Sequence, residues 1–101
     1  NLDFLRAHRD AVIRFAKAYD KSLHWAFADP KAIDYYADGM NVSRDLALAA
    51  SKYYTREAEQ PYQIKGLQRT LDDALAAKRI DRPMTPEDIK GLIDIVWKPG
   101  S

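Results

Sequence analysis

The segment from Phe4 to Pro30 places the strongest limit on how this chain can fold. Its apolar side chains recur at steps of three and four residues, a spacing that collects them on one face of an α-helix. The side chains on this face are Val12, Phe15, Ala16, Tyr19, Leu23 and Ala26, and Ile13, Trp25 and Phe27 widen it. An apolar arc this wide indicates a helix that packs against neighbours on more than one side.

Four shorter helical patterns follow this segment, and no strand pattern separates them. We therefore predict an all-α fold, a five-helix bundle-like array that forms a single helical domain over residues 1–101. Short connections make consecutive helices antiparallel neighbours. The predicted helices span approximately residues 3–28, 30–38, 44–54, 64–78 and 86–96. The first helix has a break near its start, so the long helix could begin at Asp10 instead.

Capping signals set the expected helix boundaries. Asp29 and Pro30 end the first helix and begin the second, because Asp accepts from free first-turn N–H groups and Pro suits the first helical position. Gly39 is expected to end the second helix in a left-handed conformation, and Ser43 to cap the third. Thr85, followed by Pro86 and two acids, marks the start of the last helix.

The polar stretch from Thr55 to Gln63 is predicted to be the one long loop, and Pro61 reinforces this prediction. Gly66 is expected to weaken the first turn of the helix that follows.

The charges of the chain exclude several classes of partner. Sixteen basic and fifteen acidic residues are interleaved and give a net charge of +1. Nucleic acids and anionic membranes need clustered Lys and Arg, so we expect neither as a partner. No apolar run approaches 18 residues, so no membrane insertion is expected. The chain holds no cysteine, which is compatible with the cytoplasm or the periplasm.

No residue pattern predicts a catalytic, metal or cofactor site, so we expect no enzymatic activity and no cofactor. His8 and His24 lack a second ligand at metal-binding spacing, although Asp20 precedes His24 by four residues. The serines lack the context of a nucleophile. The remaining acids occur at helix starts and on polar faces, where the helix dipole and solvation explain them: Asp72, Asp73, Glu87, Asp88, Glu57 and Glu59.

Two other features leave binding alternatives open. The doublets Tyr35-Tyr36 and Tyr53-Tyr54 could each place one ring in the core and one at the surface, where it could stack on a base or sugar. The second and third helices could form a helix-turn-helix around residues 39–41. Arg44 is the one base-reading side chain at the start of the third helix, which weakens this DNA-binding alternative.

The chain also resembles a known family, and this likeness covers nearly all of its length. Phe4-Leu5, His8, Asp10-Ala11-Val12, Phe15, Ala18 and Trp25 are similar to the late part of periplasmic substrate-binding proteins of bacterial ABC importers, of the sulfonate, nitrate and thiamine-precursor type. Lys31-Ala32-Ile33, the turn from Gly39 to Val42, the helix from Ser43 to Ala50 and the stripe from Ile64 to Ile80 continue the likeness. Arg9 departs from the family, which often has Pro there.

The resemblance implies that this chain is the C-terminal helical portion of a two-lobe α/β binding protein for small-molecule uptake. Its ligand-binding residues are then unknown and lie upstream of Asn1, so none is assigned here. The implied partners are the upstream lobes of its own parent chain and, through them, an ABC permease, and the implied location is periplasmic. We expect the isolated chain to expose apolar surface and to self-associate. The alternative is a stand-alone helical protein-interaction module that uses the same apolar arc as a docking groove.

Overall fold

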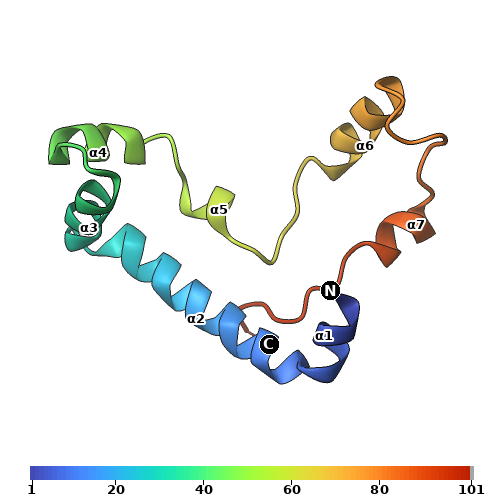
Figure 1. The fold of residues 1–101 in the computed structure, drawn as a ribbon, viewed down its shortest axis with the longest axis horizontal. Helices are drawn as coiled ribbons and strands as arrows, with labels where there is room; N and C mark the ends of the chain where they lie inside the picture. The colour runs from blue at the N-terminus through green and yellow to red at the C-terminus, as the bar shows by residue number, and fades with distance from the viewer. Residues whose placement is uncertain (101) are drawn as a thin grey trace. The chain divides into compact units, whose positions relative to one another are not determined.

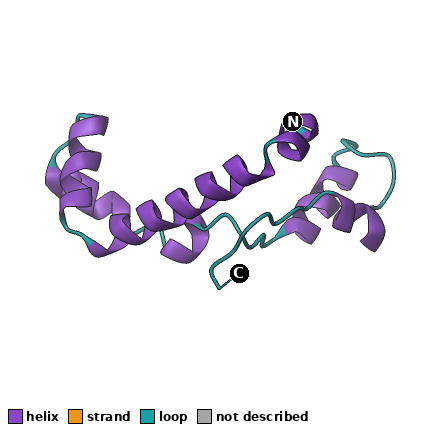
Figure 2. Cartoon of the chain, turned by 90° about the horizontal axis from the view of Figure 1, so that it is seen from below, coloured by secondary structure: helices purple, strands orange, loops and turns teal. Residues whose placement is uncertain are grey.

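The computed structural model describes residues 1–100, and every regular element among them is a helix (Figure 2). The all-α prediction is therefore confirmed for this part of the chain. Within residues 1–100, seven helices replace the predicted five: α1 (Leu2–Ala7), α2 (Arg9–Ala28), α3 (Lys31–Met40), α4 (Arg44–Ser51), α5 (Arg56–Glu59), α6 (Leu67–Ala76) and α7 (Pro86–Gly91).

The helices belong to two compact units, one from Asn1 to Pro61 and one that begins at Tyr62. The first unit contains α1 to α5, and the second contains α6 and α7. The expectation of a single domain over residues 1–101 stays a prediction.

The predicted first helix is two helices, because the backbone leaves the helical conformation at His8, with φ −133° and ψ 37°. The side chain of Asn1 caps α1 by accepting from the N–H of Asp3 at 2.9 Å. The break falls two residues before Asp10, close to the interruption that the sequence indicates. Helix α2 ends at Ala28, and its C-cap Asp29 has the extended backbone that a following proline imposes on its predecessor.

The turn from α2 into α3 follows the predicted chemistry in part, because Pro30 is the N-cap and α3 begins one residue later, at Lys31; the end of α3 does not follow it. Asp29 Oδ1 accepts from the N–H of Lys31 at 2.9 Å, so Asp29 does satisfy a free donor of the first turn. The prediction that Gly39 ends this helix is wrong, because Gly39 stays helical and Asn41 takes the left-handed conformation, with φ 53°. Asparagine is the residue that most often replaces glycine there.

Helices α3 and α4 form the most closely packed pair of the first unit and lie side by side beyond the end of α2 (Figure 1). Ser43 caps α4 as predicted, because its Oγ accepts from the N–H of Leu46 at 3.2 Å. Ala37 on α3 and Ala47 on α4 are buried, with exposed fractions of 5% and 1%. Leu23 on α2 is the only other buried residue in the described chain, so the core consists of three small or medium side chains.

A short helix lies inside the stretch that we predicted to be a loop. Thr55 caps α5 by accepting from the N–H of Ala58 at 3.2 Å. Two polar contacts then attach α5 to α2: the hydroxyl of Tyr19 donates to the carbonyl of Glu59 at 3.1 Å, and Arg56 lies 3.6 Å from Asp20. These contacts join residues far apart in the sequence, which is why hydrophobic periodicity gave no sign of them.

Both helices of the second unit are shorter than predicted. Gly66 has a φ of 73° and precedes α6, so this helix begins at Leu67 rather than at residue 64. Lys78 takes a left-handed φ of 56°, and the N–H of Arg79 donates to the carbonyl of Ala74 at 2.8 Å, which closes the end of α6. The predicted start of α7 is correct, but α7 ends at Gly91 rather than near residue 96.

A capping box explains why the start of α7 is well defined. Thr85 Oγ1 accepts from the N–H of Asp88 at 3.1 Å, and Asp88 Oδ2 accepts from the N–H of Thr85 at 2.9 Å. Arg82 donates to the same carboxylate oxygen at 2.7 Å. The Arg82 guanidinium and the two bonds with Thr85 hold the pKa of Asp88 well below its ordinary value.

The close approach of α3 and α4 can be tested at Ala47. We expect Ala47→Leu to destabilise the first unit by about 1–3 kcal/mol, because added methyl groups overfill a packed contact. Ala49→Leu, at an exposed position two residues along the same helix, is the matched control and should change stability little. Thermal unfolding followed by circular dichroism measures both variants, and equal stability of the two would contradict the packing of α3 on α4.

The capping box predicts a pH dependence of α7. The folded-state pKa of Asp88 is lowered, so the ionised Asp88 side chain stabilises α7. This contribution is fully present above the unfolded-state pKa of about 3.9 and is lost as the pH falls through the folded-state pKa. We therefore expect the helical Cα chemical shifts of residues 86–91 to decline in acid. Asp88→Asn should lower these shifts at neutral pH and remove most of their acid dependence. Glu87→Gln, in the same first turn, should preserve both properties.

Candidate functional site

The first unit contains a groove of about 560 Å³ between the end of α2, α3 and α4, named here the α2–α4 groove. A volume of this size lies within the range of ligand pockets in proteins. The groove is lined by Ala26, Phe27, Ala28, Asp29, Pro30, Ala32, Ile33, Tyr36, Arg44, Leu48, Ser51, Lys52 and Tyr54.

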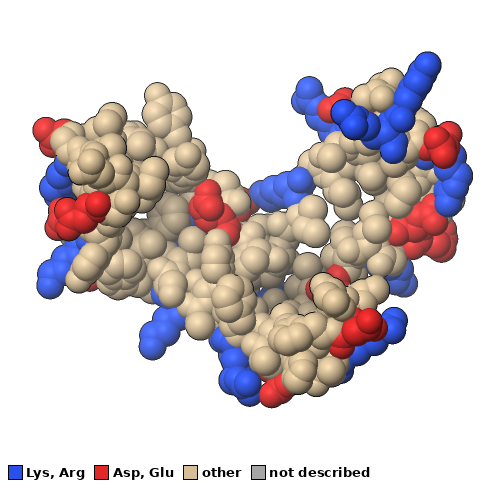
Figure 3. All heavy atoms as spheres, in the orientation of Figure 1, with Lys and Arg blue, Asp and Glu red and all other residues tan. Residues whose placement is uncertain are grey.

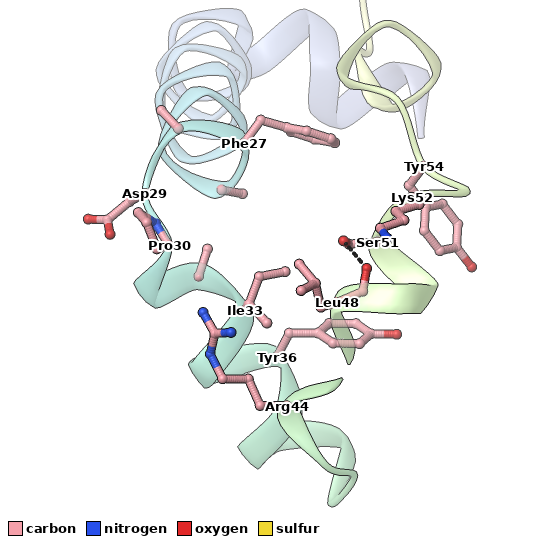
Figure 4. A pocket seen from close by; sticks show the side chains of 13 residues that line it. Phe27, Asp29, Pro30, Ile33, Tyr36, Arg44, Leu48, Ser51, Lys52 and Tyr54 are labelled. Carbon is pink, nitrogen blue, oxygen red and sulfur yellow. Dashed lines mark hydrogen bonds between the residues drawn. The ribbon is translucent and has the colours of Figure 1, made fainter. Parts of the chain in front are cut away.

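Helical spacing explains why these side chains line one surface. Ile33 and Tyr36 are three residues apart on α3, and Leu48 and Ser51 are three residues apart on α4, so each pair occupies one helix face. Figure 4 shows Ile33 and Leu48 pointing toward each other across the groove. Phe27 approaches the same space from the end of α2 in this view.

Several large apolar side chains of the groove remain open to solvent. Phe27 is 45% exposed, Tyr36 44%, Leu48 40% and Tyr54 56%. Contiguous exposed apolar surface of this kind marks protein interaction sites or ligand grooves more often than isolated exposed residues do. The groove therefore has the character of a docking surface.

Polar groups near the groove bond to groups of the chain itself. The hydroxyl of Ser51 donates to the carbonyl of Leu48 at 2.7 Å, which is the dashed line in Figure 4. Arg44 Nε donates to Asp34 Oδ1 at 2.8 Å. The first contact lies at the end of a helix and the second is an exposed ion pair. These contacts do not bring together a nucleophile, a base and an oxyanion donor, which catalysis requires.

The Asp29 carboxylate also links the aromatic side of α2 to the turn before α3. Trp25 Nε1 donates to Asp29 Oδ2 at 3.1 Å, and the Trp25 ring centroid lies 5.9 Å from that of Tyr35 at an interplanar angle of 50°. Tyr35, from the first aromatic doublet, thus packs on Trp25, while Tyr36 lines the groove. The two members of this doublet face different surfaces, as adjacent helix positions do. Neither ring lies in a core, where one was expected, because Tyr35 is 67% exposed and Tyr36 44%.

The structure does not bring the two histidines into a site. His8 occupies the junction of α1 and α2, where its ring centroid lies 4.7 Å from that of Phe4. His24 is exposed on α2. Asp20, the acid nearest to His24 by helical spacing, lies 3.6 Å from Arg56. Within residues 1–100, no group of three His, Cys, Asp or Glu side chains could hold a metal ion.

Three of the acids that the sequence singles out, Asp72, Asp88 and Glu59, take part in local structural contacts. Asp88 completes the capping box of α7. Asp72 accepts from Gln68 Nε2 at 2.9 Å, one turn earlier on α6. Glu59 contributes its backbone carbonyl to the contact with Tyr19. These positions are those of helix caps and helix surfaces, which the sequence also indicates.

The DNA-binding alternative has little support from the geometry of α3 and α4. The turn between them is centred on Asn41 and Val42, slightly later than predicted. Arg44, its one candidate for reading a base, pairs with Asp34, and a base contact would require this pair to open. In the first unit, basic and acidic side chains are intermixed on the face drawn in Figure 3, without a continuous basic stripe.

Comparison of the chain with protein-family models, curated proteins and solved structures gives no match. Among the described residues, no helix has both the length and the hydropathy that a membrane span requires.

Sequence reasoning did not identify the α2–α4 groove. Phe27, Ile33 and Leu48 are apolar residues within predicted helices, but the sequence does not indicate that they meet at one surface. The missing information was the direction in which α3 and α4 leave the end of α2. That direction depends on the Asp29-Pro30 turn and on the left-handed Asn41, and periodicity within one helix does not specify it.

The docking character of the groove can be tested with the dye 8-anilinonaphthalene-1-sulfonate, which fluoresces on apolar surfaces. We expect Leu48→Gln to weaken binding of the dye by roughly tenfold, which corresponds to a loss of about 1.4 kcal/mol. Leu46→Gln is the matched control, because Leu46 is 57% exposed on the same helix but does not line the groove. A fluorescence titration that shows equal losses for both variants would contradict a binding surface at the groove.

Proposed function

We propose that this chain is the C-terminal helical part of an ABC-importer substrate-binding protein for small-molecule uptake, of the sulfonate, nitrate or thiamine-precursor type. In this proposal the chain works in the periplasm, has no enzymatic activity and carries no ligand site of its own. It covers and stabilises a lobe formed by upstream parts of the same polypeptide. The residue pattern from Phe4 to Trp25 suggests the family. The small amount of apolar surface that the chain buries by itself supports the structural role.

The observation that carries the proposal is the shortage of buried surface. The chain exposes 8414 Å², whereas two separately compact units of these sizes would expose about 7,000 Å² in total. A protein with 47% hydrophobic residues but only three buried ones in the described chain is suited to packing against further structure.

The position of the exposed apolar surface agrees with this role. Phe15 on α2 is 69% exposed, and Tyr19, on the same face, is 37% exposed. Further along α2, Phe27 is 45% exposed where it enters the groove. Side chains of this size contribute about 1.5–3 kcal/mol each when a partner buries them fully. The apolar arc of α2 therefore offers substantial binding energy to a covering lobe.

A supporting role explains the absence of convergent polar groups from the described helices. Two-lobe binding proteins act by closing their lobes on a ligand like a hinge, so their recognition groups lie in the cleft between the lobes. A helical segment outside the cleft needs an apolar face toward its lobe and a solvated face opposite. The importer fragment and a stand-alone interaction module therefore differ in what covers α2, and not in the chemistry of a binding site.

The second candidate function is a stand-alone helical protein-interaction module, and the α2–α4 groove is the observation that favours it. The groove is concave, apolar and formed by three helices of one unit. Such a groove could receive an apolar helix face from a separate protein, as helix-binding domains do. In this alternative the partner is supplied by another chain rather than by an upstream lobe.

Both candidates predict self-association of the isolated chain, because its apolar surface lacks a cover. We expect sedimentation equilibrium to give an average mass above 11.5 kDa that rises with protein concentration. The double variant Phe15→Ser, Phe27→Ser should bring the mass toward the monomer. Tyr53→Ser is the control, because Tyr53 is 89% exposed but lies outside both α2 and the groove lining. A wild-type monomer at high concentration would contradict this prediction.

The coding sequence upstream of Asn1 distinguishes the two candidates. The proposal predicts a signal peptide followed by α/β segments in the same reading frame. Co-expression of those segments with residues 1–101 as a separate polypeptide should then give a complex, and Phe15→Ser with Phe27→Ser should weaken it. A reading frame that starts within a few residues of Asn1 would overturn the transport proposal and leave the interaction module.

A further inference from the structure

We draw no further inference here: the strongest candidate, the apolar α2–α4 groove with Phe27, Ile33 and Leu48 around it, carries none because nothing in the structure shows which partner or ligand covers it.

Discussion

Helices α3 and α4 are the most closely packed pair in the first unit. Their contact depends on small side chains. Ala37 and Ala47 are nearly inaccessible to solvent, whereas the large residues around them remain partly exposed. Small residues permit close approach of two helices, but each buries little apolar area. Because hydrophobic stabilisation is about 25 cal/mol per Å² of apolar surface buried, each of these alanines contributes little. The unit therefore has a defined geometry without a large core. Its large apolar side chains remain partly exposed as a consequence.

Local capping compensates in part for the small core. Asn1, Ser43, Thr55 and Thr85 each accept from a backbone N–H in the first turn of a helix. Such contacts are worth about 0.5–2 kcal/mol each and require no tertiary packing. They fix where helices begin, but they do not decide how helices pack. The result is a set of well-delimited helices whose apolar faces remain available to other structure.

The parts of the fold that could be predicted from sequence are those that depend on neighbouring residues. The start of α7 at Thr85 and Pro86 was predictable because the capping box lies within four residues. Asn41 was not, because Gly39 is the stronger left-handed signal and the choice between them depends on how far α3 continues. The contact of α5 with Tyr19 could not be predicted, since forty residues separate Tyr19 from Glu59. The cap of α5 is local, because Thr55 accepts from the N–H of Ala58, but the polar composition and Pro61 favoured a loop there. The groove depends on such long-range geometry throughout, whereas the width of the apolar arc on α2 was visible in the sequence.

The exposed arc and the groove make different demands on a partner, and this difference bears on the transport proposal. Phe15 lies in the middle of α2, whereas Phe27 lies at its end beside α3 and α4. A flat lobe surface could cover the middle of α2, but the groove requires a protruding element to fill about 560 Å³. Packing on an upstream lobe therefore accounts for the whole apolar surface only if that lobe presents both a flat region and a projection. An independent partner helix would account for the groove but would leave Phe15 in solvent.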